Sequence, residues 1–318
     1  MKFSNQNLVQ RPENDPVIVP TYKENAKTSE KIYCRDPYIL LYGGWYYLYH
    51  RADGERIACR VSDDLENWSD SVTVFAPPAD FHGTKDLFWA PECHYYNGAF
   101  YIFTSVHSSL TGHRSISVYR ANNPLGPFED IAGGCITPKD WDAIDGTLYV
   151  DADGAPWMVF VHEWTCMPDG VGTMVAAKFS DDLTHFVSEP MELFRADAMA
   201  GAVMGVTDGA YLFQTENGGL QMIWSNFTKN GYVIAVAKSE SGTIHGPWVQ
   251  RDHLLYEKGM RPEFATDGGH AMIFQDKNGQ ALLSMHGPNA TSEEDFEHIQ
   301  IWKIIEKDGT IEIGSQLK

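Results

Sequence analysis

Five copies of one pattern constrain the fold of this chain more than any other feature. In each copy a polar residue precedes an apolar run, and a glycine-containing turn leads into a second run rich in apolar or aromatic residues. The third copy runs from Ala143 to Val161, and residues 151–154 between its two runs have the composition of a hairpin turn. The polar residues that lead the five copies are Asp36, Glu92, Asp145, Asp208 and His270.

The leading residues recur at intervals of 53 to 63 residues. A near-constant period with several short strands in each copy is typical of a β-propeller, and five copies predict five blades. The sequence therefore predicts an all-β, five-bladed β-propeller in a single domain. Because the innermost strand of each blade lines the central channel, we expect the five polar residues to surround one axis.

The first part of the chain does not share this pattern. Residues 1–32 show no periodicity and are rich in Asn, Pro, Glu and Lys, which predicts a surface segment before a propeller over residues 33–318. Two kinds of turn followed by an aromatic residue end the blades. They are Ser-Asp-Asp-Leu-x-x-Trp/Phe at 62–68 and 180–186, and Gly-Pro-Phe/Trp at 126–128 and 246–248. We expect these aromatic rings to fill the gaps between adjacent blades.

The charge of the chain limits its partners. With 43 acidic and 24 basic residues, the net charge is −19, which disfavours binding to nucleic acid or to an anionic membrane and fits a neutral substrate. Residues 1–10 lack the apolar core of a secretion signal, and no apolar run is long enough to span a bilayer. The five cysteines are odd in number and scattered, which is typical of reduced thiols. These features predict a cytoplasmic protein.

Three of the leading residues are carboxylates beside a turn. Asp36 precedes Pro37, and Asp145 and Asp208 each precede a glycine. A carboxylate that points into a narrow channel is partly desolvated, which raises its pKa unless a partner compensates. Several such groups around one cavity suit glycoside hydrolysis, in which one group protonates the leaving oxygen and another activates water. Asp-Gly and Asp-Pro are also ordinary turn pairs, but their repetition at one place in separate copies favours function.

Four of these motifs together resemble the blade-leading motifs of glycoside hydrolase family 43. They are Arg35-Asp36-Pro37, Trp89-Ala90-Pro91-Glu92, Ile144-Asp145-Gly146 and Val206-Thr207-Asp208-Gly209. The resemblance implies a five-bladed propeller that hydrolyses β-xylosides or α-L-arabinofuranosides of plant-type oligosaccharides, such as those of xylan or arabinan, with inversion. It further implies a general base at Asp36, an orienting and acid-tuning carboxylate at Asp145, and the general acid at position 208.

At position 208 the sequence departs from the family pattern. Most members have Glu-Gly-Pro there, whereas this chain has Asp208-Gly209-Ala210. Aspartate is one methylene shorter, so its carboxyl reaches about an ångström less far into the channel. A backbone shift could absorb that difference, or another residue could deliver the proton. Glu163 is the first alternative and Glu92 the second, and either could instead contact the substrate or be a carboxylate without a catalytic part.

A metal and several aromatic contacts are also candidates. His270 follows Gly268-Gly269, which lets the backbone approach the axis, and the resemblance implies that it holds Ca²⁺, largely through waters. The alternative is a hydrogen-bonded core histidine, since calcium prefers oxygen ligands. Trp89, Trp164 and Trp224 lie near the ends of inner strands, where a sugar ring could stack.

Two other interpretations remain to be weighed. Propellers that cleave fructosides with retention also carry Arg-Asp-Pro and Glu-Cys motifs, but here Arg35-Asp36-Pro37 comes first and Glu92-Cys93 precedes the third copy, which is the wrong order. A non-catalytic carbohydrate-binding propeller is the other alternative, supported by the absence of the usual acidic Glu at position 208. A fold alone does not establish activity.

Overall fold

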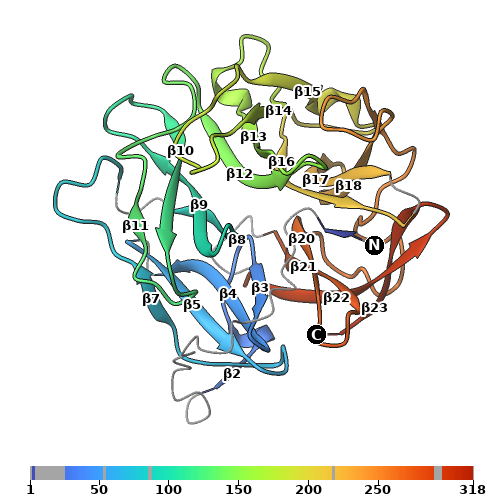
Figure 1. Cartoon of the computed structure of the whole chain (residues 1–318). Coiled ribbons are helices and arrows are strands. Elements are labelled where there is room, and N and C mark those ends of the chain that lie inside the picture. The colour runs from blue at the N-terminus through green and yellow to red at the C-terminus, as the bar shows by residue number, and fades with distance from the viewer. Residues whose placement is uncertain are drawn as a thin grey trace.

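The computed structural model describes residues 2–3, 26–52, 55–84, 88–216, 219–289 and 296–317. Within them, five antiparallel sheets surround a common centre in chain order, with β3, β8, β12, β16 and β20 nearest that centre (Figure 1). The prediction of an all-β, five-bladed propeller is confirmed. None of the three short 3₁₀ helices in the described residues approaches the length and apolarity that a bilayer-spanning helix needs.

Each blade contains four strands from one continuous stretch of chain, and β1 (Lys2–Phe3) adds a fifth strand to the sheet of blade four. Blade one contains β3 (Tyr38–Tyr42), β4 (Trp45–Ala52), β5 (Arg56–Ser62) and β7 (Val72–Phe75). Blade two contains β8 (Trp89–Tyr96), β9 (Ala99–His107), β10 (Arg114–Ala121) and β11 (Glu129–Asp130). Blade three contains β12 (Ala143–Val150), β13 (Pro156–His162), β14 (Thr173–Lys178) and β15 (Met191–Arg195). Blade four contains β16 (Asp208–Gln214), β17 (Leu220–Thr228), β18 (Gly231–Ser239) and β19 (Trp248–Gln250). Blade five contains β20 (Gly269–Gln275), β21 (Ala281–Gly287), β22 (His298–Lys307) and β23 (Thr310–Gln316).

The remaining elements are short. Most of the predicted surface segment, residues 1–32, lies outside the described residues. Of the parts that are described, β1 (Lys2–Phe3) pairs with β16, and β2 (Lys27–Thr28) pairs with β6 (Asn67–Trp68). The 3₁₀ helices are η1 (Ser29–Lys31), η2 (Trp164–Cys166) and η3 (Ala196–Ala198).

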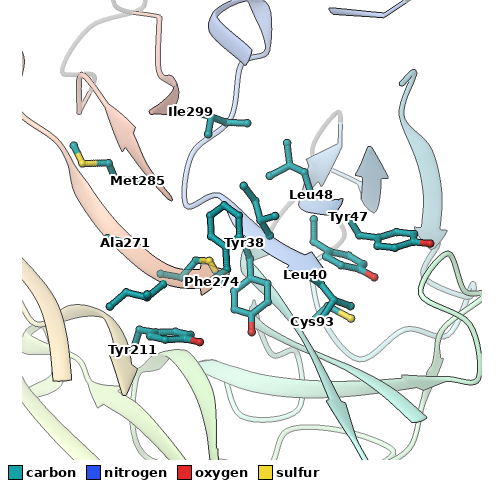
Figure 2. Close-up of a cluster of buried hydrophobic side chains, with 14 of the residues drawn as sticks. Tyr38, Leu40, Tyr47, Leu48, Cys93, Tyr211, Ala271, Phe274, Met285 and Ile299 are labelled. Atoms are coloured by element: carbon teal, nitrogen blue, oxygen red, sulfur yellow. The ribbon is translucent and has the colours of Figure 1, made fainter. Parts of the chain in front are cut away.

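The hydrophobic core lies between the blades, because each sheet presents apolar side chains on both faces. Figure 2 shows Tyr38 and Leu40 of blade one near Cys93 of blade two and Phe274 of blade five, all in one cluster of buried side chains. Separate clusters fill the spaces between blades two and three and between blades three and four. This packing holds the five inner strands in fixed positions around the channel.

The Ser-Asp-Asp-Leu turns have the same local structure in both blades that contain them. Leu65 and Leu183 both have positive φ, 64° and 56°, and the Ser hydroxyl at the start of each turn accepts backbone N–H groups. After the first turn, Trp68 is fully buried and donates its indole N–H to the hydroxyl of Ser29 at 2.9 Å. The turn therefore fixes an aromatic ring in the core, as the sequence predicts.

The ring closes through the residues that precede blade one. The Cys34 N–H donates to the Glu297 carbonyl at 3.1 Å, and Tyr33 forms a β-bridge with His298 at the start of β22. The Arg35 Nη1 lies 2.6 Å from the buried carboxyl of Glu297. These contacts bind the start of blade one to blade five and bring the next residue, Asp36, to the mouth of the channel.

Candidate active site

One backbone conformation recurs where the inner strand of each blade begins. A single residue there has φ in the left-handed region, which is uncommon for residues other than glycine. These residues are Asp36 (φ 52°), Ala90 (43°), Asp145 (54°), Gly209 (54°) and His270 (47°). In blades two to five the strand register is interrupted at this point, as expected for a β-bulge. The bulge redirects the chain, so that neighbouring side chains face one end of the channel.

In two blades, the residue with positive φ is not the polar residue that leads the sequence copy. In blade two it is Ala90, two residues before Glu92, and in blade four it is Gly209, one residue after Asp208. In these two blades the polar residue of the motif and the residue with positive φ are therefore different residues.

The preceding blade holds three of these residues by their backbone amides. The Asp145 N–H donates to Ser105 Oγ at 3.0 Å, the His270 N–H to Ser225 Oγ at 2.8 Å, and the Asp36 N–H to His286 Nδ1 at 3.2 Å. The three acceptors lie on β9, β17 and β21, the second strands of their blades. The corresponding position in blade three is apolar, and there the Gly209 N–H donates to Asp145 Oδ2 at 3.1 Å.

A cavity of about 550 Å³ opens at this end of the channel. It is lined by residues from all five blades, and among them are seven that the sequence singles out. The seven are Asp36, Trp89, Asp145, Glu163, Trp164, Asp208 and His270. The structure thus brings the three candidate catalytic carboxylates into one pocket with aromatic walls.

Asp36 is held as a carboxylate. Its Oδ1 lies 3.1 Å from His270 Nδ1 and 3.9 Å from Arg35 Nε. Burial alone would raise the pKa of Asp36, but the positive charge of His270, with a smaller contribution from Arg35, holds the pKa well below its usual range. His270 in turn remains an imidazolium, because Asp36 and Asp145 outweigh its burial and raise its pKa to about 10.

Asp208 is held as a neutral acid. Burial, and then the negative charge of Asp145, raise the pKa of Asp208 to about 8, although Tyr232 donates its hydroxyl proton to Asp208 Oδ2 at 3.0 Å. The other oxygen, Oδ1, is buried and has no hydrogen-bond partner among the described residues. Burial also raises the pKa of Asp145, whose Oδ2 lies 3.8 Å from His270 Nδ1. The pocket therefore holds an ionised carboxylate and a protonated carboxyl at the same pH.

No motif in the sequence marks Tyr232 as a site residue. Tyr232 is the second residue of β18, and its ring stacks on His286 at 5.7 Å between centroids. Burial lowers the pKa of His286, so its ring is neutral, and its Nε2 lies 3.2 Å from Asn289 Oδ1. We infer that Nε2 donates to Asn289 while Nδ1 accepts the Asp36 amide. Tyr232 lies on an outer strand, and the apolar sequence of that strand resembles any other core segment.

Glu163 lies on the side of the pocket formed by blades two and three. Its Oε2 is 2.5 Å from Arg114 Nε, and the Arg114 guanidinium lies 5.4 Å from the centre of the Trp89 ring. Burial raises the pKa of Glu163, while the pairing with Arg114 opposes that effect. The Arg114 guanidinium is therefore paired with Glu163, whereas the hydrogen-bond partner of Asp208 is the neutral hydroxyl of Tyr232.

Glu92 and Trp224 do not line the pocket. Glu92 is buried further along the inner strand and its Oε2 lies 3.1 Å from His94 Nε2. Trp224 is 0% exposed in the cluster between blades three and four, and its indole N–H donates to Gln250 Oε1 at 2.9 Å. A fully covered ring cannot stack on a sugar, so the structure gives Trp224 a packing role instead.

The fit of a calcium ion to His270 can be judged from its neighbours. The Nδ1–H of His270 points to Asp36, and the protonated ring carries a positive charge that repels a cation. The described residues contain no group of three or more His, Cys, Asp or Glu side chains arranged to hold a metal ion. These features fit calcium poorly, so no chemistry is assigned to a metal here, and calcium binding stays a prediction.

A five-bladed propeller with three carboxylates and aromatic walls at one end of its channel defines a class of carbohydrate-active protein. The family model for "Glycosyl hydrolases family 43" matches residues 31–308. The chain therefore belongs to glycosyl hydrolase family 43, as the motifs predict.

Two curated relatives share part of the chain. An extracellular exo-α-(1→5)-L-arabinofuranosidase of Cellvibrio japonicus is 29% identical over 182 residues, which cover 52% of this chain and 48% of that protein. An extracellular endo-α-(1→5)-L-arabinanase of Bacillus subtilis is 27% identical over 142 residues, which cover 41% of this chain and 43% of that protein. The matches span a little under half the length of each relative.

Solved structures resemble the whole propeller. An endo-arabinase from Bacteroides thetaiotaomicron has a TM-score of 0.80 and 34% identity, and the match covers 92% of this chain and 100% of that one. An endo-1,4-β-xylanase from the same organism has a TM-score of 0.74 and 27% identity, covering 92% of this chain and 98% of that one.

The prediction of a cytoplasmic location is wrong by these comparisons, because both curated relatives are named extracellular enzymes. That prediction rested on the first ten residues and on unpaired cysteines. The five cysteines are free in the structure, but free thiols alone do not specify a compartment.

Proposed function

We propose that this protein is a glycoside hydrolase that cleaves α-L-arabinofuranosyl linkages of arabinan with inversion of configuration. Asp36 acts as the general base and Asp208 as the general acid. Asp145 raises the pKa of Asp208 and orients the amide of Gly209. The same pocket would have to bind an arabinose unit at the channel mouth, with Trp89 and Trp164 as its aromatic walls.

The main observation behind the proposal is that one cavity holds a carboxyl with a lowered pKa, Asp36, and another with a raised pKa, Asp208. A general base must be ionised and a general acid protonated at the working pH. Asp36 meets the first requirement, because His270 and Arg35 hold its pKa below the usual range. Asp208 meets the second, because burial and Asp145 raise its pKa to about 8.

The reaction follows from these states. Asp36 takes a proton from a water, which attacks the anomeric carbon from the side opposite the leaving group. Asp208 delivers its proton to the leaving oxygen. In inverting enzymes the two carboxyl groups lie about 6.5–9.5 Å apart to leave room for the water.

A hydrogen bond from Tyr232 could allow an aspartate to replace the usual glutamate. Its hydroxyl donates to Oδ2 of Asp208, which fixes the orientation of the short side chain. The N–H of Tyr232 donates to Asp267 Oδ2 at 3.1 Å, so the tyrosine is itself anchored. The lost methylene is thereby offset by a rigid carboxyl orientation.

Arabinan is favoured over xylan by the relatives. Both curated relatives and the endo-arabinase structure are named for arabinan linkages, whereas the xylanase structure shares 27% identity. Xylan is the second candidate, and it is tested in the same experiment.

The test is reducing-sugar release from linear α-1,5-arabinan and from xylan by the wild type and by Asp36→Asn. We expect turnover on arabinan that falls by about 10³-fold or more in Asp36→Asn, because the amide cannot accept a proton. Unchanged binding of arabinan by both proteins without turnover by either would instead support a non-catalytic binding propeller. Turnover on xylan alone would reject arabinan as the substrate.

A further inference from the structure

A second cluster of reactive side chains lies on blade two, outside the pocket. His82, in the connection after β7, places its Nε2 3.1 Å from Oδ2 of Asp130 on β11. Its other ring nitrogen, Nδ1, is 3.9 Å from Sγ of Cys135. The order Cys–His–Asp is the arrangement in which a histidine activates a thiol and a carboxylate orients the histidine. None of the three residues lines the pocket.

The backbone holds this arrangement in place. Asp130 Oδ1 accepts the N–H groups of Ala132 and Gly133 at 3.0 and 2.9 Å, which leaves Oδ2 for the histidine. Gly133 and Gly134 have φ of 64° and 148°, and this turn returns the chain so that Cys135 faces His82. The carboxylate, imidazole and thiol are therefore aligned by a short loop, not by chance contact of long side chains.

The surroundings stabilise the charged form of the thiol. Burial would raise the pKa of Cys135, but His82 and the hydroxyls of Ser108 and Ser115 lower it below its usual value. Asp130 and Cys135 raise the pKa of His82 to about 9, so the ring is an imidazolium at neutral pH. Tyr119, a further titratable group near Asp130 and Cys135, has a raised pKa and stays neutral.

We propose that Cys135, His82 and Asp130 form a reactive-thiol site that undergoes exchange with low-molecular-weight disulfides. The Cys135 thiolate attacks one sulfur of the disulfide, a new sulfur–sulfur bond forms, and the second sulfur leaves as a thiolate that takes a proton from water. The co-reactant is the disulfide itself, so no other oxidant is required. This site is independent of the proposed glycosidase activity.

The other cysteines supply internal controls. Cys34, Cys59 and Cys93 are buried and have raised pKa values. Cys166 is partly exposed like Cys135, but burial raises the pKa of its thiol. Because only the thiolate is nucleophilic, Cys135 and Cys166 should differ in reactivity although both are partly exposed.

The experiment measures the rate at which native protein reacts with dithiodipyridine between pH 5.5 and 9, with the modified cysteine assigned by peptide mass spectrometry. We expect Cys135 to react at least about tenfold faster than Cys166 at pH 6, and to lose less of its rate than Cys166 between pH 8 and pH 6. Cys166 should lose about tenfold for each pH unit over that range, because its thiolate fraction falls in proportion.

Two variants test the partners of the thiol. His82→Gln and Asp130→Asn should lower the rate of Cys135 at pH 6 by about tenfold while leaving Cys166 unchanged in the same molecule. Rates of Cys135 and Cys166 that are equal in the wild type, or that fall together with pH, would overturn the proposal. If the His82→Gln protein does not fold, the wild-type pH profile decides alone.

Discussion

Replacing Gly209 by alanine should disable the site without touching a carboxylate. A Cβ on Gly209 would lie 2.7 and 2.8 Å from Cδ2 and Cγ of His270 and 2.9 Å from its Cα. Ordinary contact begins near 3.4 Å, so His270 would have to retreat by about 0.7 Å. Because one of the three atoms belongs to the backbone, rotation of the imidazole ring cannot relieve the clash.

The magnitude follows from that displacement. Overpacking and a left-handed alanine together cost about 2–5 kcal/mol of unfolding free energy. A retreating His270 also weakens its 3.1 Å contact with Asp36, and misplacement of a reacting group by about an ångström lowers kcat by about 10²-fold. The measurements are kcat on linear arabinan and the thermal melting temperature.

The matched control is Ala90→Gly, since Ala90 has the same left-handed conformation in blade two and already carries a Cβ. We expect near-normal kcat for that variant. A Gly209→Ala protein with wild-type kcat and melting temperature would refute the claim that His270 is held by close contact with blade four.

For three further substitutions, the structure predicts the direction of the effect. Asp145→Asn should move the basic limb of the kcat profile to lower pH, because losing the neighbouring negative charge lowers the pKa of Asp208 and its proton is lost sooner as pH rises. Tyr232→Phe should move that limb to higher pH, because a donor to the carboxylate form is lost; two limbs moving in the same direction would contradict the account. Trp224→Phe should leave KM unchanged but cost about 1–3 kcal/mol in urea unfolding, since Gln250 Oε1 loses its donor, and a raised KM would place Trp224 at the substrate.

The fold and much of the site could be predicted because short segments of the sequence specify both. The five repeats specify the blades, and the turns beside Asp36, Asp145 and Asp208 mark the ends of the strands that line the channel. His270 could be found in the same way. Each of these residues belongs to a short motif at the start of an inner strand, so residues that are close in sequence are also close in space.

The rest depends on contacts between blades. Tyr232 and Arg114 lie at the starts of third strands, and their roles arise only when neighbouring blades pack against them. Glu92 and Trp224 were placed at the site because a strand-end motif was assumed to point into the channel. The bulge at Ala90 and the full burial of Trp224 show that one residue of register decides the direction of a side chain.

The most direct test of the central claim compares two leaving groups in Asp208→Ala. A general acid matters most when the leaving group is poor, so the variant should lose about 10³-fold or more in kcat/KM on an arabinooligosaccharide. It should largely retain activity on p-nitrophenyl α-L-arabinofuranoside, whose phenolate leaves without a proton. Glu163→Ala should show no such selectivity, because the Glu163 carboxyl is paired with Arg114. Equal losses on both substrates in Asp208→Ala, or selective loss in Glu163→Ala, would contradict the assignment of Asp208 as the acid.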